Sequence, residues 1–510
     1  MSAIISGTIN VTHYSPYSDD DIFDNVLFNI FTDAWLVLAG DDQFHNVTAA
    51  GAGQLRVRGP LEVDGLALQD DIAIVNSAKV TQHGTVSLGA SDHDAVLARN
   101  LPGATWDVVG RAEIAQAGPN SRFINLGLFE QTGAANTTVT SADFYSRGTV
   151  HVEGKLNFTG AVTRLFGSVE GAGQVTAGTA VLIGASLSCA AFSASTLRVL
   201  GEVTSSTQSL TVDRLVLVAA RLSVASDKNN SKFKEIVGQG EVNFAGATQL
   251  EEASTPFGSS HFSQGGVLTV GGQIALTNAG DLSLFGQATD ISALGGYSAA
   301  TIQLSGGAHI VNQAGATWTD AGYTSSILGE DDGLAVFINL GVFVEGSFGH
   351  LAHVQNEGVM KLGPGRPTTP VILNSPLYYP DLEFLSAVDG SGEIDVGPGE
   401  FRMDGAVAAQ QDLVFVAQAG DPAATLFLAD VRDFAATVTG FAANGASDDR
   451  LVIDESGWSF ADFAPNAGGT GGALIFSDGA AQTSVSLLGS YDPAKFHAAI
   501  SGTRTTITYG

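Results

Sequence analysis

Apolar and polar residues alternate in short runs along most of this chain. Examples are the segments 55–63, 149–158, 197–203, 210–218 and 267–276. A period of two residues sends successive side chains to opposite faces of a strand, so that one face of each run can be buried. No long segment keeps the 3.6-residue period of an amphipathic helix. The pattern predicts an all-β protein built from many short strands.

Two short motifs recur between these runs. A Gly-x-Gly-[Gln/Glu] motif, followed by alternating apolar residues, begins at Gly51, Gly171, Gly238 and Gly390. Each copy predicts a tight turn that leads into a strand with one inward face. An apolar-Asn-x-Gly-apolar motif occurs at Asn125/Gly127, Asn278/Gly280, Asn339/Gly341 and Asn356/Gly358. Because Asn and Gly both tolerate left-handed backbone, we expect these pairs to turn corners between strands.

A longer match relates two distant blocks of the chain. Gly103-Ala-Thr-Trp106 precedes Phe123-Ile-Asn-Leu-Gly-Leu-Phe129, and Gly315-Ala-Thr-Trp318 precedes Phe337-Ile-Asn-Leu-Gly-Val-Phe343. The shared order indicates an internal duplication, at about 103–160 and 315–365. Short strands at close spacing can form a sandwich, a propeller or a solenoid, but the Asn-Gly and Asp-Gly hairpin turns of a sandwich are scarce. We therefore predict a right-handed parallel β-helix (a β-solenoid) of roughly 20 residues per coil, with the usual right-handed crossover.

The net charge of the chain limits the kinds of partner that its surface can bind. The chain has 52 acidic and 22 basic residues, for a formal net charge of −30. This charge repels nucleic acid and anionic membranes, and it repels acidic polysaccharide unless a cation bridges the two. No apolar run approaches the ~20 residues of a membrane span. We expect no nucleic-acid partner and no membrane insertion.

Cysteine and the N-terminal segment limit the chemistry further. Cys189 is the single cysteine, so no intrachain disulfide and no Cys-based metal site can form. Its apolar neighbours predict a small core residue. The first residues lack the basic and apolar regions of a signal peptide, so we expect export to use a signal elsewhere in the chain.

The sequence changes character near Phe401. Its motifs there are, in order, Phe434-Ala-Ala-Thr-Val-Thr-Gly-Phe441, Asp448-Asp-Arg-Leu-Val-Ile-Asp454, Leu488-Gly-Ser-Tyr491 followed by Phe496, and Gly502-Thr-Arg-Thr-Thr-Ile-Thr508. This order resembles the C-terminal module of large bacterial β-helix proteins that type I secretion systems export. The resemblance covers 401–510. It implies secretion through a type I apparatus, a surface location and an adhesive or structural use, and it supplies no catalytic residues.

Physical reasoning also gives this segment a role. The end of a solenoid exposes unpaired strand edges and an open core. A terminal segment with a different periodicity can cover that end, filled by the phenylalanines Phe427, Phe434, Phe441, Phe460, Phe463, Phe476 and Phe496. The predicted organisation is an acidic N-terminal segment at 1–50, a repeat array at 51–400 and a C-terminal β capping module at 401–510.

Acidic clusters are the candidate metal sites. The best candidates for Ca²⁺ are Asp19, Asp20, Asp21 and Asp24, followed by Asp448 and Asp449; further clusters are Asp41-Asp42, Asp92-His-Asp94 and Glu330-Asp-Asp332. Ca²⁺ prefers carboxylate and loop carbonyl oxygens. A solvated turn is the commoner explanation of any single cluster, and neither the EF-hand loop nor the calcium-binding nonapeptide is present.

Catalysis has little support in the sequence. A polysaccharide hydrolase needs two carboxyl groups converging in a groove lined with aromatic residues, and a lyase acting on acidic sugars needs clustered basic residues. Trp106 and Trp318 occupy equivalent repeat positions, which predicts core packing. We expect a secreted, adhesin-like structural protein of the cell surface or extracellular matrix that is no enzyme and assembles with itself with Ca²⁺. The alternative is a carbohydrate-active β-helix that binds or cleaves surface polysaccharide.

Overall fold

The computed structural model describes residues 3–133, 137–225, 229–245, 247–252, 267–285, 299–320, 324–329, 335–345, 348–351, 353–362, 382–416, 421–442 and 449–510. Regular structure in these residues is almost entirely β-strand, with one 3-10 turn, η2 (Pro493–Lys495). The chain is a parallel β-solenoid, which confirms the predicted architecture: each strand pairs with the strands one coil before and one coil after it. It divides into two compact units, Met1–Lys232 and Phe233–Gly510.

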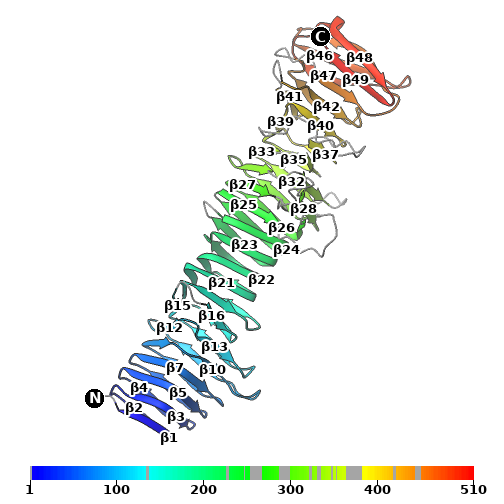
Figure 1. The fold of residues 1–510 in the computed structure, drawn as a ribbon. Helices are drawn as coiled ribbons and strands as arrows, with labels where there is room; N and C mark the ends of the chain where they lie inside the picture. The colour runs from blue at the N-terminus through cyan, green and yellow to red at the C-terminus, as the bar shows by residue number, and fades with distance from the viewer. Residues whose placement is uncertain are drawn as a thin grey trace, which may run out of the picture. The chain divides into compact units, whose positions relative to one another are not determined.

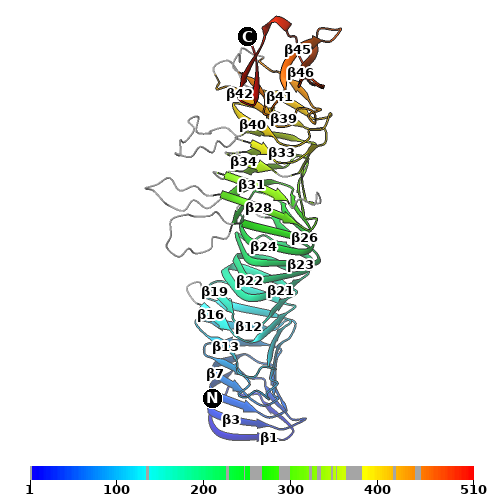
Figure 2. The ribbon, with the colours of Figure 1, turned by 90° about the vertical axis from the view of Figure 1, so that its right-hand side faces the viewer.

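The first unit stacks its strands in three parallel ladders (Figures 1 and 2). The first ladder contains β1 (Ile4–Val11), β3 (Ile22–Ile30), β5 (Asp42–Ala50), β7 (Leu61–Leu68), β10 (Val86–Leu88), β13 (Glu113–Gln116), β16 (Thr137–Thr140) and β19 (Lys155–Phe158). The second contains β2 (Tyr14–Tyr17), β4 (Trp35–Leu38), β6 (Gln54–Val57), β8 (Ala73–Asn76), β11 (Leu97–Asn100), β14 (Arg122–Asn125), β17 (Asp143–Ser146) and β20 (Thr163–Leu165). The third contains β9 (Lys79–Gln82), β12 (Thr105–Val109), β15 (Leu128–Thr132) and β18 (Thr149–Val152). Longer strands then bend through the corners and continue the ladders: β21 (Ser168–Ile183), β22 (Ser186–Ser205) and β23 (Ser209–Ala225).

The second unit repeats this plan, with β24 (Asn229–Ala245) pairing with β26 (Val267–Asn278). From β26, one ladder continues through β28 (Ala299–Ser305), β31 (Thr324–Gly329), β34 (Phe348–Leu351), β37 (Leu382–Phe384), β40 (Gly399–Met403), β42 (Ala424–Leu428) and β44 (Arg450–Ile453). Another, also from β26, continues through β29 (His309–Asn312), β32 (Val336–Asn339), β35 (Val354–Asn356) and β38 (Val388–Asp389). The third contains β25 (Ala247–Glu252), β27 (Asp281–Phe285), β30 (Thr317–Asp320), β33 (Val342–Glu345), β36 (Val359–Leu362), β39 (Glu393–Val396), β41 (Asp412–Phe415) and β43 (Thr437–Thr439).

Inward side chains stack on one another from coil to coil. Phe123 and Phe144 are paired in register and fully buried, with parallel rings 5.4 Å apart. Trp106 packs edge-on against Phe123 at 5.0 Å, and Trp318 is equally buried in the second unit, which confirms the predicted core packing of both tryptophans. Burial of each such ring contributes about 2 kcal/mol. Cys189 is buried as predicted.

The Asn-x-Gly motif does turn corners, but not by the predicted means. Asn125 ends β14 and β15 begins at Leu128, yet neither Asn125 nor Gly127 has a positive φ, so the expectation of left-handed backbone is wrong. A Cβ on Gly127 would lie 2.3 Å from the carbonyl oxygen of Ala104 in the preceding coil. The glycine is therefore required by the close approach of two coils.

The asparagine of this motif forms a buried ladder. Asn76 donates through Nδ2 to Asn100 Oδ1 at 2.8 Å, and Asn100 donates in turn to Asn125 at the same distance. In the second unit, bonds of 2.8 Å join Asn278, Asn312, Asn339 and Asn356 in that order. These side chains are fully buried, and each bond spans 17 to 34 residues of sequence. The ladder thus satisfies buried polar groups by tying one coil to the next.

Two copies of the Gly-x-Gly-[Gln/Glu] motif, at Gly51 and Gly390, lead into a strand as predicted, whereas Gly171 and Gly238 lie inside β21 and β24. Gly51 and Gly390 have φ of 110° and 99°, and each leads into a strand, β6 or β39. A Cβ at either position would meet a backbone oxygen of the preceding coil at 2.3 Å. Both the backbone conformation and the space therefore require glycine.

Strand pairing changes direction near the C-terminus. Parallel pairing continues through residue 50 and through β40–β42 to β44, so neither predicted boundary, at 50 or at 400, marks a change of pairing. Antiparallel strands then follow: β45 (Ser459–Pro465), β46 (Gly471–Ser477), β47 (Gln482–Leu488), β48 (Phe496–Ser501) and β49 (Arg504–Tyr509). They pair with the last solenoid strands: β47 runs parallel to β43, and β49 runs antiparallel to β44.

Phenylalanines fill the space among these strands. Phe463 and Phe496 have ring centroids 4.6 Å apart. Of the seven expected there, six are buried and Phe460 is half-buried; the buried ones are Phe427, Phe434, Phe441, Phe463, Phe476 and Phe496.

Candidate functional site

The structure brings four carboxylates together at one corner of the first two coils. Asp20 and Asp21 lie between β2 and β3, and Asp41 and Asp42 take the same corner one coil later. The backbone N–H of Asp41 donates to Asp20 Oδ1 at 2.9 Å, and that of Asp21 donates to Asp42 Oδ1 at 3.2 Å. The sequence showed these residues as two separate clusters. Coil stacking joins them.

Asp42 occupies a core position in this corner. It is paired in register with Leu61, and both side chains are fully buried. Its Oδ2 has no hydrogen-bond partner among the described residues. Burial raises the pKa of Asp42 to about 6, and the charges of Asp21, Asp20 and Asp41 add to the rise, while the N–H of Asp21 opposes it.

The other predicted Ca²⁺ ligands take no part in these hydrogen bonds between the two coils. Asp19 is exposed, and Asp24 lies on β3 in register with His45, where it accepts from Asn25 Nδ2 at 2.9 Å. Asp449 is buried, and its oxygens accept from the N–H groups of Ala424 and Ala442 at 3.3 and 3.1 Å. Asp448 and the segment 330–332 lie outside the described residues.

The remaining acidic cluster forms a turn. Asp94 accepts from the hydroxyl and N–H of Ser91 and from the N–H of Ala90 and Asp70, and these bonds, led by the Ser91 hydroxyl, lower its pKa. In the described part of the chain, no group of three or more His, Cys, Asp or Glu residues is arranged to hold a metal ion. Calcium binding stays a prediction.

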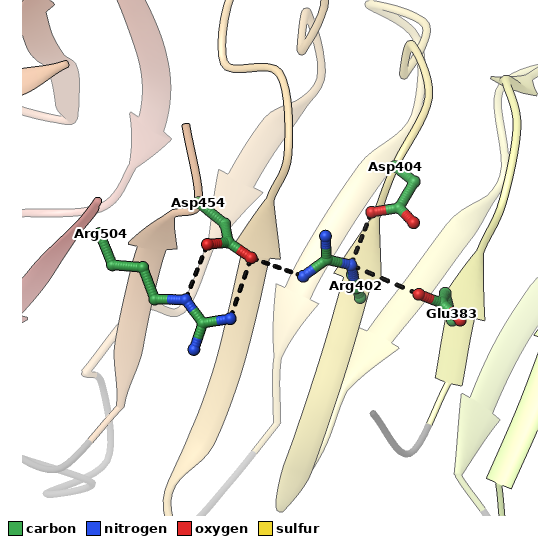
Figure 3. Close-up of polar contacts among 5 residues, drawn as sticks. All are labelled: Glu383, Arg402, Asp404, Asp454 and Arg504. Carbon is green, nitrogen blue, oxygen red and sulfur yellow. Dashed lines mark hydrogen bonds and ion pairs between the residues drawn. The ribbon is translucent and has the colours of Figure 1, made fainter. Parts of the chain in front are cut away.

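A second charged group, which the sequence did not indicate, lies where the solenoid meets the C-terminal strands (Figure 3). Asp454 follows β44 and accepts from Arg504 through both oxygens, at 2.7 and 3.1 Å. Arg402 of β40 donates to Asp454 at 2.7 Å, and its Nε lies 2.6 Å from Asp404 and 3.3 Å from Glu383. The chain of contacts therefore joins β37 and β40 to the β48–β49 hairpin.

Burial and charge act in opposite directions on the carboxyl groups of this ionic cluster. Burial alone would raise the pKa of Asp454, whose side chain is 12% exposed, but bonds and charges from Arg504 and Arg402 outweigh it and hold the pKa below its usual value. At Asp404, burial and the neighbouring Glu383 raise the pKa, against the opposing charge of Arg402. The cluster has two arginines and three carboxyl groups. Both arginines contact Asp454, whose pKa falls, whereas Asp404 and Glu383 share Arg402.

Two carboxyl pairs bear on the hydrolase alternative. Burial and the neighbouring Glu383 raise the pKa of Asp404, and burial first and Glu393 second raise the pKa of Asp395 to about 6. Glycosidases separate their two carboxyl groups by ~5 Å or more, so that a sugar fits between them. In the first pair, the Nε of Arg402 contacts both carboxyl groups, at 3.3 and 2.6 Å, so a guanidinium stands beside them where a sugar would have to fit (Figure 3).

Little in the sequence pointed to the ionic cluster. Asp454 ends the predicted 448–454 motif, but Arg402 and Arg504 belong to no repeat. Their contacts arise from pairing across 50 and 52 residues. Only the composition pointed to ion pairs of this kind. With 22 basic residues against 52 acidic ones, most basic side chains are expected to lie near a carboxylate.

Comparison with protein-family models, with curated proteins and with solved structures finds no match for this chain. No helix in the described residues is both long and apolar enough to cross a membrane.

Proposed function

We propose that this chain is an exported structural protein of the cell surface or extracellular matrix, which adheres and assembles through its solenoid surface. The observation that carries the proposal is that buried polar side chains bond to one another between coils. The side chains of the asparagine ladders form hydrogen bonds from one coil to the next. Buried side chains whose hydrogen bonds run from coil to coil serve the fold itself, as expected of a scaffold.

The C-terminal strands support a capping role. Solenoid strand edges are templates for uncontrolled pairing unless they are covered. β47 and β49 pair with β43 and β44, and aromatic rings fill the space beside them. The resemblance of 401–510 to type I-secreted modules supports export by that apparatus.

Calcium is the proposed link between copies. Chains of net charge −30 repel one another. The corner formed by Asp20, Asp21, Asp41 and Asp42 concentrates carboxylates that a divalent cation would neutralise.

Electron microscopy of the purified chain tests the assembly. We expect fibres or layers in millimolar Ca²⁺ that dissolve with EGTA, and dispersed molecules in EGTA alone. Dispersed molecules under both conditions would overturn self-assembly. Release of reducing ends from polysaccharide by the same sample would instead favour the carbohydrate-active alternative.

A fusion experiment tests the route of export. A passenger protein joined to 401–510 is expected to reach the medium only in cells with a type I apparatus. Retention of the passenger in those cells would contradict the proposed role of this module in export.

A further inference from the structure

Basic residues gather on one face of the first unit of this acidic chain. Residues 1–232 contain 14 of the 22 basic residues. On the outer face of the second ladder, one column runs in register through Arg56, Val75, Arg99, Ile124, Tyr145, Arg164, Val181 and Arg198. The adjoining column, two residues earlier on each strand, contains Arg122, Asp143 and Arg214. We call these two columns the arginine face.

Three of the six guanidinium groups on the arginine face are available to a partner. Arg99, Arg122 and Arg198 are exposed, and none has an ion pair among the described residues. Arg164 contacts Asp143 at 2.7 Å, and Asp143 is the one acidic residue of the two columns from β4 to β23. The arginine face is therefore positive although the whole chain is strongly negative.

Aromatic rings accompany the arginines. The guanidinium of Arg56 lies 3.7 Å above the ring of Trp35, which is 39% exposed. Tyr145 lies in the arginine column beside Phe166, and Arg147 stands over both rings at 5.6 and 5.4 Å. Rings beside cations provide apolar surface for a sugar next to donors for its acidic groups.

We propose that the arginine face binds an acidic polysaccharide laid along the stacking direction of the coils. Strands stack at ~4.8 Å, so Arg56 and Arg99, like Arg164 and Arg198, stand two rungs or about 10 Å apart. A linear glycan with carboxylate or sulfate groups at regular intervals presents anions in a similar row. Guanidinium groups recognise both anions through paired hydrogen bonds.

Charge complementarity favours this partner over a second copy of the chain. Two copies, each of charge −30, repel one another at long range, whereas a polyanion is drawn to a row of guanidinium groups. The inference rests on the proposed surface function and names its partner. It also revises the expectation that acidic polysaccharide is repelled, which treated the charge as evenly spread.

Binding of the full chain to polygalacturonate in EGTA, with uncharged dextran as the reference, tests the proposal. We expect binding to polygalacturonate alone, weakening as salt rises, and about tenfold weaker binding by Arg99→Gln/Arg198→Gln. Arg111→Gln/Lys155→Gln removes two exposed cations outside the arginine face and is expected to bind like the unaltered chain. Thermal unfolding checks that both variants fold.

Several results would overturn the inference. These are equal binding of dextran, equal losses in the two double variants, or no binding by the unaltered chain. A variant that loses self-association in sedimentation while keeping polygalacturonate binding would assign the face to a second copy. Failure of the calcium-dependent fibres leaves this result untouched, so the two proposals fail separately.

Discussion

A fully buried carboxyl group without a partner for one oxygen makes Asp42 a source of pH dependence. Its pKa is about 6 in the fold, against about 3.9 in an unfolded chain, so the folded state binds more protons between these values. Stability is therefore expected to rise as pH falls from about 7 to about 4. Asp42→Asn, which keeps an oxygen for the N–H of Asp21, should gain on the order of 2 to 3 kcal/mol at pH 7.

Denaturant unfolding of both proteins across this pH range, in EGTA, measures the effect. The two curves are expected to approach each other toward pH 4 and to converge below it, where the aspartate becomes neutral in both states. Asp92→Asn changes the same charge at an exposed turn and is expected to leave the curve unaltered. Equal stability of the Asp42 variant and the unaltered chain at pH 7 would refute the argument.

The two duplicated blocks differ at one hydrogen bond. Trp106 donates to Gln82 at 2.9 Å, and Gln82 donates to the carbonyls of Gly84 and Glu113, both at 2.8 Å. In the second block Leu284 takes the position equivalent to that of Gln82, two residues after the strand partner of Trp318. The indole N–H of Trp318 has no hydrogen-bond partner among the described residues. One copy of the duplication thus has a hydrogen-bond acceptor for its tryptophan, and the described part of the other copy has none.

Replacing Gln82 by Leu should therefore destabilise the first unit. The change removes the acceptor of the buried Trp106 indole and a donor from the part-buried carbonyls of Gly84 and Glu113, and we expect a loss of about 3 kcal/mol in the free energy of unfolding. Gln82→Glu, which keeps an acceptor for Trp106, separates loss of the indole bond from loss of the amide donors. Unfolding midpoints within error of the unaltered chain would show that water replaces Gln82.

Single residues show what the sequence could and could not specify. The positive φ at Gly51 and the burial of Trp106 were predictable, because each depends on local pattern. The role of Gly127 was not, since it depends on a carbonyl of Ala104 one coil away. The contact of Asp20 with Asp41 was hidden for the same reason. Sequence alternation reveals faces but not which coil lies against which.

At the scale of elements, the ionic cluster is expected to fasten the C-terminal hairpin to the solenoid. Asp454→Asn removes the charge that holds Arg402 and Arg504. Breaking such a partly buried pair leaves two cations without their shared partner, and we expect a local loss of about 2 kcal/mol. Hydrogen exchange of the β48–β49 amides should become faster, while β46 exchanges as before.

The pH dependence of this contact has the opposite sign from that of Asp42. Because the pKa of Asp454 is lowered in the fold, its stabilisation is present above pH ~4 and is lost as pH falls through the folded pKa. Exchange of β49 in the unaltered chain should therefore accelerate in acid. Asp462→Asn, at an exposed carboxylate of β45, serves as control. If the β49 amides exchange at the same rate in the unaltered chain, Asp454→Asn and Asp462→Asn, the ionic cluster does not hold the hairpin to the solenoid.

The strands and their parallel stack were largely predictable, whereas the change of pairing direction near the C-terminus was not. Alternation located β6, β18 and β19, and the recurring Gly and Asn motifs with few hairpin turns predicted the parallel stack. The change of composition near Phe401 suggested a new module there, yet parallel coils continue to Ile453 and antiparallel strands begin at Ser459. Alternating strands have the same sequence pattern in either direction, so the switch depends on contacts that the sequence does not display.

For the whole molecule, the distribution of charge matters more than its sum. Residues 233–510 contain 30 of the 52 acidic residues and 8 of the 22 basic ones. The first unit has a far more even balance, and six of its 14 basic residues lie on the arginine face. Self-repulsion is therefore expected to burden the second unit more than the first.

Salt should relieve this repulsion unequally. Raising NaCl from 10 to 150 mM shortens the screening length from about 30 to about 8 Å. We expect hydrogen-exchange protection to rise in both units, with the larger gain in 233–510, because more like charges lie there within the unscreened distance. KCl at the same ionic strength should act equally if screening is the cause. A larger gain in 1–232, or a loss of protection in the second unit, would show that attractive pairs such as Arg402 with Asp454 outweigh repulsion there.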